Sequence, residues 1–430
     1  MGFTLETWPL IPVGCALICG ILLEGDVGKV TQDLLVKNAL IFDGVNPELR
    51  EGSIRIINGK IEAIGKVDSS TKGDIPMIDA KGCVLTPGFI DCHFHAYGFE
   101  LDMMKSESTP RSYVALKGRT RLEAALQRGF TTVRDVAGGD AGLARAIDEG
   151  LIASPNYYYT GPALSQTGGH GDPRHAVLEM CCEGKIGVEV VDGVDPLRVA
   201  VRDRLRKGAH AIKIMASGGV VSLTDPIRIP QYSAEEIRAV AEEATRRGSY
   251  VAAHAYSPES IIHAVTNGVR SIEHANLLND EAAKCMAQHN AVMVPTLVTY
   301  LMMAEKGAAI GMAPVSLQKN HEVLAAGKSA IEIAAKQGIL IGFGTDLMGD
   351  LEFAQLRGLE VQHEVQGTLE VLRSVTSRNA QILKNPLAGT ISEGAYGDLV
   401  ILDGNPFDKP SVLWTQSEGR KVIKAGRVVA

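Results

Sequence analysis

The sequence predicts an α/β protein in which a (β/α)8, TIM-like barrel is joined to a small β-sandwich. Short apolar runs alternate with helical segments through the middle of the chain, as the fully buried strands of a parallel sheet require. Both chain ends instead carry short strands of alternating polarity joined by Gly and Asn turns. The 430 residues suffice for one large barrel and an accessory domain.

The chain divides into three parts under this interpretation. Residues 1–32 form an N-terminal extension, residues 33–82 and 385–430 form the composite β-sandwich, and residues 83–384 form the barrel. The sandwich strands are expected in DLLVKNALIFDG, EGSIRIINGKIEAIG, GDLVILDGNP and RKVIKAGRVV. A doubly wound open sheet is the main alternative, but no G-x-G-x-x-G follows the first strand to favour it.

Eight apolar runs are the candidate barrel strands. They are CVLTPGFIDCHFH, FTTVRDV, NYYYTG, AIKIMAS, YVAAHAY, SIEHAN, VMVPTLV and ILIGFGTD. Between them, Ser233 and Glu236 form a capping box ahead of an apolar helix that Gly248 ends. A second helix is expected over residues 280–289, with Asn279 as its cap. Strands and helices therefore alternate as a (β/α)8 barrel requires.

The composition is that of a folded globular protein, with 45% hydrophobic and 22% charged residues. The net charge of −7, without a long run of Lys or Arg, argues against nucleic acid or an anionic membrane as the main partner. The seven cysteines contain no C-x-x-C pair, which makes a disulfide framework unexpected. A reducing compartment, and hence the cytoplasm, is the expected location.

The apolar run LIPVGCALICGILL, residues 10–23, is the feature that argues for another location. It has the length of a signal-peptide core and is too short for a membrane span. No Lys or Arg precedes it, Glu6 has the wrong charge, and no A-x-A pattern follows it. The protein is secreted or periplasmic if residues 1–25 act as a signal, and otherwise these residues are a dispensable extension.

Six metal-competent side chains lie at the predicted strand ends, where barrels of this kind build their sites. They are His93, His95, Lys213, His254, His274 and Asp346. A single strand-end histidine is more often a hydrogen-bonded core residue than a ligand, and an Asp after G-x-T can cap a helix. Independent accidents do not explain six such residues at one rim, so the sequence predicts a metal centre.

Lys213 needs its own explanation because an ammonium does not bind a cation. Burial lowers the pKa of a lysine, and the neutral amine can add carbon dioxide to become a carbamate that bridges two ions. His93 and His95 face the same side of a strand and can bind one ion together. One ion would be held by His93, His95, Asp346 and carbamylated Lys213, and the other by Lys213, His254 and His274. These ligands suit two zinc ions, with manganese or cobalt as substitutes.

The ligand set resembles that of the amidohydrolase superfamily, from the His-x-His after PGFID to the Asp in GTD. The segments ALSQTGGHGDPR and IKIMASGGVVS are similar to a subgroup that contains metal-dependent Xaa-Pro or Xaa-basic dipeptidases and ochratoxin A amidohydrolase. The resemblance extends from residue 33 to the C-terminus. It also implies a homo-oligomer, with an octamer as one form.

The resemblance implies roles for residues outside the ligand set. His170 in GGHGD would polarise the substrate carbonyl or hold the substrate, unless it only stabilises its loop. Tyr232 in PQYSAEE would donate to the developing oxyanion or the substrate carboxylate, unless it only packs before the capping box. Arg174 is a candidate substrate contact that can also simply pair with Asp172. Residues 173–193 depart from the dipeptidase pattern, which leaves the acyl-side preference open.

The implied reaction is hydrolysis of the amide between an acyl or aminoacyl group and a C-terminal amino acid. Metal-bound hydroxide would attack the carbonyl while Asp346 takes the proton and delivers it to the leaving nitrogen. One alternative is a cyclic-amide hydrolase of the hydantoinase or dihydropyrimidinase type. Imidazolonepropionase-like ring hydrolases and deaminases of the superfamily generally lack the strand-four lysine. A non-catalytic scaffold is the remote alternative, since such relatives have typically lost metal ligands.

Overall fold

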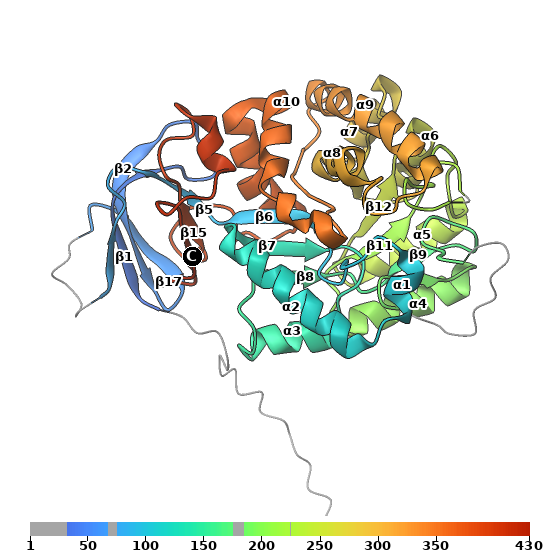
Figure 1. Ribbon diagram of the computed structural model, residues 1–430, viewed down its shortest axis with the longest axis horizontal. Helices are drawn as coiled ribbons and strands as arrows, with labels where there is room; N and C mark the ends of the chain where they lie inside the picture. Colours follow the sequence, from blue (N-terminus) through green and yellow to red (C-terminus); the bar gives the residue numbers. More distant parts are fainter. Residues whose placement is uncertain (1–31, 68–74, 175–184, 224) are drawn as a thin grey trace, which may run out of the picture.

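The computed structural model describes residues 32–67, 75–174, 185–223 and 225–430. The expectations for the signal-like segment of residues 1–25, and for most of the 1–32 extension, lie outside the described residues. Residues 175–184, part of the segment 173–193 that departs from the dipeptidase pattern, also lie outside the described residues. The described chain has two regions, a mixed sheet on one side and a body of parallel strands surrounded by helices (Figure 1).

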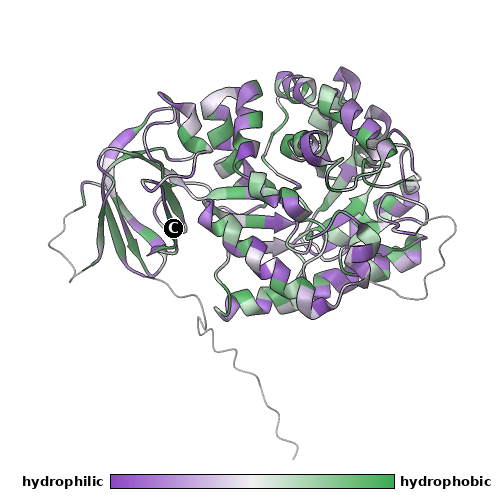
Figure 2. Cartoon of the chain, viewed as in Figure 1, coloured by the Kyte–Doolittle hydropathy of each residue, from purple (hydrophilic) through white to green (hydrophobic). Residues whose placement is uncertain are grey.

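Strands from both chain ends form one mixed sheet in the order β17-β16-β15-β5-β1-β2-β3, with β4 paired to β1. The strands are β1 (Leu34–Ile41), β2 (Arg50–Ile57), β3 (Lys60–Gly65), β4 (Met77–Asp79), β5 (Val84–Pro87), β15 (Leu399–Ile401), β16 (Lys421–Lys424) and β17 (Arg427–Val428). β5 joins the two ends, because it pairs with β1 on one side and with β15 on the other. The strands are predominantly hydrophobic (Figure 2), and residues such as Ile54, Ile56 and Leu399 form their own buried core.

The run expected as the first barrel strand is divided between the two regions. β5 belongs to the mixed sheet of the chain ends, whereas β6 (Phe89–Phe94) pairs with the parallel strands. Pro87 has no N–H for a continuing ladder, and a Cβ on Gly88 would lie 2.0 Å from Thr131 Oγ1. The change from the mixed sheet to the parallel strands therefore lies at Gly88.

The parallel strands form two sheets among the described residues. The first contains β6, β7 (Phe130–Asp135) and β8 (Asn156–Tyr159) in that order. The second has the order β10-β9-β11-β12-β13-β14, with β9 (Ala163–Ser165), β10 (Val188–Val190), β11 (Ile212–Met215), β12 (Val251–Ala255), β13 (Ser271–His274) and β14 (Val292–Val294). Most of the strands expected from apolar runs are buried along their whole length, whereas β9 and β10 were not expected.

The eighth expected strand, ILIGFGTD, does not form a regular strand. It has one bridge, between Ile341 and Met293, and it continues beside β6, where Cys92 N donates to Phe343 O over 3.0 Å and Asp346 N to His93 O over 2.7 Å. A Cβ on Gly344 would lie 2.5 Å from His93 Cβ. The glycine thus allows the backbone to approach His93 closely, at the expense of a regular ladder.

Helices surround the parallel strands (Figure 1). They are α1 (Met103–Ser108), α2 (Arg111–Gln127), α3 (Ala141–Asp148), α4 (Val194–Arg206), α5 (Ala234–Arg246), α6 (Pro258–Thr266), α7 (Asp280–Gln288), α8 (Leu297–Lys306), α9 (Pro314–Lys336), α10 (Arg357–Arg373) and α11 (Asn379–Ile382). The capping box of Ser233 and Glu236 is confirmed, as is the Asn279 cap.

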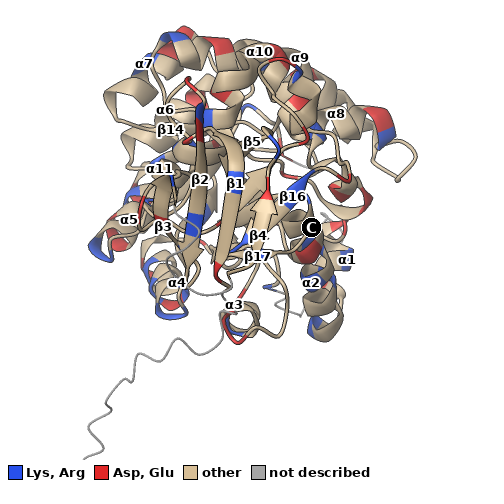
Figure 3. Cartoon of the chain, turned by 90° about the vertical axis from the view of Figure 1, so that its left-hand side faces the viewer, with Lys and Arg blue, Asp and Glu red and all other residues tan. Residues whose placement is uncertain are grey.

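Charged residues of both signs are interspersed over these helices in the view of Figure 3. Within the described ranges, no helix has both the length and the apolar character needed to cross a membrane. Cys83, Cys92 and Cys285 are free thiols.

Candidate active site

The six predicted ligands converge at the carboxyl ends of the parallel strands. β6, β11, β12 and β13 carry or directly precede the histidines and the lysine, and Asp346 ends the irregular eighth segment. All six line one cavity of about 120 Å³, namely His93, His95, Lys213, His254, His274 and Asp346. Asp346 is partly exposed and the other five are buried.

Asp346 lies close to three of the predicted histidine ligands. Its Oδ1 lies 2.8 Å from His95 Nε2 and 3.4 Å from His93 Nε2, and its Oδ2 lies 3.8 Å from His274 Nδ1. The ligand atoms of His93, His95 and Asp346 all lie within 4.8 Å of one another. Burial acts to raise the pKa of Asp346, but the two neighbouring histidines hold that pKa well below its usual range. The carboxylate is therefore ionised, as a metal ligand must be.

Three of the histidines are suited to bind a metal because one nitrogen of each ring already has a polar partner in the protein. His93 Nδ1 lies 2.8 Å from Glu273 Oε2, His274 Nδ1 lies 2.8 Å from Thr296 Oγ1, and His254 Nε2 lies 3.1 Å from the Gly218 carbonyl. Burial lowers the pKa of His254 and of His274 well below the usual value. Neutral imidazoles with one nitrogen occupied are suited to bind a cation through the other.

Lys213 is the unusual member of the cluster. It is 2% exposed, and no hydrogen-bond partner of its Nζ is found among the described residues. Burial lowers its pKa to about 8, although the Glu273 and Asp346 carboxylates oppose that shift. A neutral amine is therefore accessible near neutral pH, as addition of carbon dioxide requires.

His170 lies in the same cavity, as expected, although it is on a loop. Its ring stacks on that of His254 with 4.3 Å between centroids, and ring Nδ1 lies 2.8 Å from Ser222 Oγ. The backbone N–H of His170 donates to Gln231 Oε1 over 2.9 Å. Burial lowers the pKa of His170 to about 4. A Cβ on Gly219 would lie 1.9 Å from His170 Cε1, so only glycine leaves room for the ring.

Tyr232 and Arg174 are not brought into this cavity. Tyr232 is packed in the core, where its hydroxyl donates to the Val191 carbonyl over 3.0 Å. The hydroxyl thus has a backbone partner in this structure, and its donation to an oxyanion stays a prediction. Arg174 pairs with Asp172 over 2.6 Å and lines a wider groove outside the cavity.

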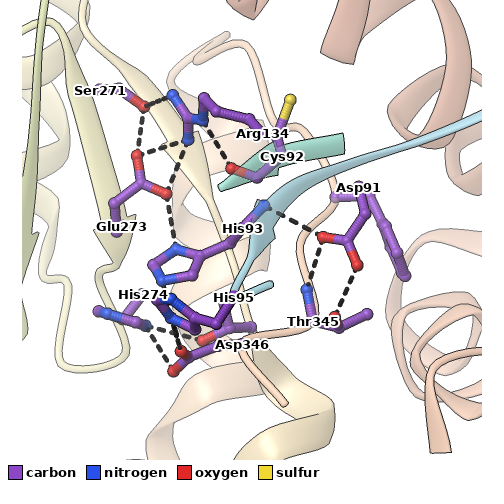
Figure 4. Close-up of polar contacts among 12 residues, drawn as sticks. Asp91, Cys92, His93, His95, Arg134, Ser271, Glu273, His274, Thr345 and Asp346 are labelled. Atoms are coloured by element: carbon purple, nitrogen blue, oxygen red, sulfur yellow. Dashed lines mark hydrogen bonds and ion pairs between the residues drawn. The ribbon is translucent and has the colours of Figure 1, made fainter. Parts of the chain in front are cut away.

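Residues behind the ligands were not expected from the sequence (Figure 4). Asp91 accepts from the Thr345 hydroxyl over 2.6 Å and from His93 N over 3.1 Å, and it thereby fastens the Asp346 segment to β6. Arg134 pairs with Glu273 over 2.7 Å. The sequence held a signal for that pair, since each is a charge inside an apolar run and a buried charge requires a partner.

The remaining cavity wall is largely apolar, with Met103, Ile186, Val188, Met215, Val220, Tyr256, Tyr300, Met303 and Met348. Two carboxylates of the wall already have partners. Glu107 accepts from the N–H groups of Ile186 and Gly187 over 2.8 Å each, and Glu100 pairs with Lys105. Glu100, Met103 and Val221 line both the cavity and the wider groove, so the groove adjoins the cavity.

Comparison with known proteins agrees with this geometry. The model of the Amidohydrolase family matches residues 84–429. Ochratoxinase of Aspergillus niger is 32% identical over 94% of this chain and 87% of that protein. A prolidase complexed with N-methylphosphonate-L-proline has a TM-score of 0.88 and 40% identity, covering 92% of this chain and 99% of that chain. A Xaa-Pro dipeptidase with methionine bound in its active site has a TM-score of 0.83 and 28% identity, with the same coverage.

The residues that the family model matches include the whole ligand cluster and, of the mixed sheet, the strands β5, β15, β16 and β17. The prolidase and the dipeptidase align over nearly their full lengths, so the likeness extends to the complete described fold. The chain therefore belongs to the amidohydrolase family and is a hydrolase that acts on carbon–nitrogen bonds.

Proposed function

We propose that the protein is a metal-dependent amidase, built on a (β/α)8 barrel, that releases a C-terminal amino acid from an acyl or aminoacyl group. The observation that carries this proposal is the buried Lys213 in one cavity with four predicted histidine ligands and Asp346. Relatives named ochratoxinase and Xaa-Pro dipeptidase favour this branch of the family over ring hydrolases.

The proposed cofactors are two divalent ions, zinc in the first instance, for which carbamylated Lys213 would serve as a ligand. His93, His95 and Asp346 would hold one ion, and His254 and His274 the other, with Lys213 shared. Bound there, the ions supply Lewis acidity and lower the pKa of a water molecule. Carbamylation joins the Lys213 nitrogen to the carbon of carbon dioxide and releases one proton.

The protein's own residues then orient the substrate and move the proton. Asp346 accepts the proton of the attacking water and returns it to the leaving nitrogen, since an unprotonated amine leaves poorly. His170 contacts the substrate carbonyl or carboxylate from the loop opposite, where its Nε2 is not used by any described residue. The wider groove, which Arg174 lines, receives the part of the substrate that extends out of the cavity.

The cavity wall favours apolar substrates. Four methionines line it, and methionine adapts to irregular apolar groups. Among the described wall residues, Glu107 and Glu100 already have partners, so neither is available for a basic side chain. We expect Xaa-Pro dipeptides and N-acyl-phenylalanine to be hydrolysed better than Xaa-Arg dipeptides.

The test is hydrolysis of a small panel by zinc-loaded protein and by the Lys213→Ala variant, with a metal count for each. The panel holds Xaa-Pro and Xaa-Arg dipeptides, an N-acyl-phenylalanine, ochratoxin A and dihydrouracil. Turnover of compounds with a C-terminal amino acid, lost in Lys213→Ala together with bound metal, supports the proposal. Activity on dihydrouracil alone moves the protein to the cyclic-amide hydrolases, and full activity of Lys213→Ala rules out the bridged centre.

A cytoplasmic homo-oligomer also belongs to the proposal. Sedimentation of the purified protein tests the oligomer, and fractionation of cells that express the full chain tests the location.

A further inference from the structure

Arg134 and Glu273 form an ion pair inside the body of parallel strands. Arg134 lies on β7 and Glu273 on β13, and both side chains are 0% exposed. Arg134 Nη2 donates to both carboxylate oxygens, over 2.7 and 2.8 Å. Because β7 and β13 belong to different parallel sheets, the pair connects the sheet that carries His93 with the sheet that carries Lys213.

The pair is poorly explained as a source of stability. Burying two charges has a large desolvation cost, and exchanging such a pair for packed apolar residues is often neutral or stabilising. The remaining polar atoms here are satisfied as well: Arg134 Nε donates to the Cys92 carbonyl over 2.6 Å, and Ser271 Oγ donates to Glu273 over 2.6 Å. A fully satisfied buried network makes the positions of its members rigid.

Glu273 contacts a predicted ligand directly, and Arg134 contacts the residue next to that ligand. Glu273 Oε2 lies 2.8 Å from His93 Nδ1, and a carboxylate paired with a guanidinium carries no proton, so His93 is the donor. In the neutral ring that binds a metal, the lone pair of His93 is then on Nε2, the nitrogen that faces Asp346 over 3.4 Å. Arg134 donates a hydrogen bond to the carbonyl of Cys92, the residue before His93. Glu273 directly precedes another predicted ligand, His274, on β13 (Figure 4).

We propose that the Arg134–Glu273 pair is a positioning device for the metal centre. It fixes the tautomer of His93 and holds the two ligand-bearing sheets in register, so that the ligands meet without rearrangement when a cation binds. The inference rests on the proposed function only in requiring that the cluster binds metal.

The test is Glu273→Gln, compared with Glu243→Gln as a matched control. Glu243, on α5, is also buried and also accepts from arginines, over 2.7 Å from Arg202 and 2.9 Å from Arg198, but it touches no predicted ligand. In Glu273→Gln the side-chain amide places an NH2 group against either Arg134 or His93, both of which are donors. Calorimetric titration of the metal-free full-length proteins with zinc gives the affinity of each step.

We expect Glu273→Gln to weaken at least one zinc-binding step by about 10–100-fold, the usual effect of losing a partner behind a metal-binding histidine. Glu243→Gln should lower the unfolding midpoint of the metal-free protein and leave both zinc affinities unchanged. Wild-type zinc affinities in Glu273→Gln would overturn the inference. A wild-type protein that binds no zinc would instead overturn the proposed function.

A second variant guards against failure of Glu273→Gln to fold. Arg134→Met combined with Glu273→Gln removes both charges and leaves no unpaired buried ion, so the fold is expected to survive. The proposal requires this double variant to bind zinc more weakly than the wild type, in proportion to the single variant. Unchanged binding in the double variant would show that the pair only contributes to packing.

Discussion

His93 and His170 line the same cavity but are held by different chemistry. His93 lies on the strand β6, and its Nδ1 faces the ionised carboxylate of Glu273. His170 lies on a glycine-rich loop, and its Nδ1 faces the neutral hydroxyl of Ser222 over 2.8 Å. A carboxylate behind an imidazole makes the other nitrogen a stronger ligand than a hydroxyl does. The proposed ligand His93 therefore has the stronger electrostatic support, whereas the proposed substrate contact His170 has the same kind of partner as the predicted ligand His274.

The two histidines also differ in how their backbones are supported. Asp91 fastens β6 to the Asp346 segment through buried hydrogen bonds. The loop near His170 depends on Lys319, whose Nζ donates to the carbonyls of Gly219, Ser222 and Asp225 over 3.1, 2.8 and 2.7 Å. The side of the cavity that carries His93 is thus built on strands, and the side that carries His170 consists of loops that one partly buried ammonium helps to hold.

The largest effect is expected on the metal side, from Asp346→Asn. The amide cannot accept a proton, so kcat should fall by about 10²–10⁴-fold, the usual contribution of general acid–base catalysis. Steady-state kinetics with saturating zinc measures the fall. The exposed Asp350 lies four residues away, and Asp350→Asn should retain wild-type kcat. Equal activity of Asp346→Asn and wild type would remove Asp346 from the reaction.

His170→Asn tests the substrate side of the cavity. Loss of one substrate hydrogen bond should lower kcat/KM by about 10–100-fold, since about 1.4 kcal/mol corresponds to a factor of ten. The number of bound metal ions, measured by atomic absorption, should not change. If the variant loses an ion, His170 is a metal ligand and the distinction between the two histidines fails.

Gly219→Ala tests the position of the His170 ring without altering any functional group. The added Cβ would lie 1.9 Å from His170 Cε1, so the ring must move away from its contact with Ser222. We expect a loss of kcat/KM close to that of His170→Asn, with the far-ultraviolet circular dichroism spectrum and the metal content unchanged. A variant with wild-type kinetics would show that the position of this ring is unimportant.

A smaller effect is expected from Lys319→Met, and Lys328→Met on the same helix is its control. Lys319 satisfies three backbone carbonyls, so its loss should lower the free energy of unfolding by about 1–3 kcal/mol. Lys328 forms an exposed pair with Glu364, and such pairs contribute about 0–1 kcal/mol. Urea unfolding compares the two. Equal destabilisation would mean that Lys319 does not organise the loop.

The smallest effect concerns Glu243, which is remote from both histidines. Hydrogen bonds from Arg202, with Arg198 and Arg246 nearby, lower its pKa from 4.5 to about 2 although burial opposes the shift. The folded state therefore binds this proton less tightly than the unfolded state, and the ionised form stabilises the fold. The stability difference between wild type and Glu243→Gln should be constant above about pH 5 and shrink as the pH falls from 4.5 towards 2. Urea midpoints measured at several pH values decide this, and a difference that does not shrink contradicts the shift.

That the predicted ligands share one cavity was predictable, because strand order and strand ends are encoded locally. Apolar runs of strand length identify buried parallel strands, and a polar residue at the end of such a run must lie at the rim. For that reason the amino-acid sequence alone is enough to place His93, His95, Lys213, His254 and His274 in one site. The capping box at Ser233 was predictable for the same local reason.

Contacts between distant segments depend instead on how the whole chain packs. The partners of His93 and His170 lie 180 and 52 residues away in sequence, and no local pattern states which buried acid or hydroxyl will face which ring. Tyr232 illustrates the same limit, because its position before a capping box does not reveal that its hydroxyl donates to Val191. Which groups reach the rim thus followed from the sequence, since burial and strand direction are local properties. Packing across the molecule decided which group contacts the second nitrogen of each ring, because those partners come from distant parts of the sequence.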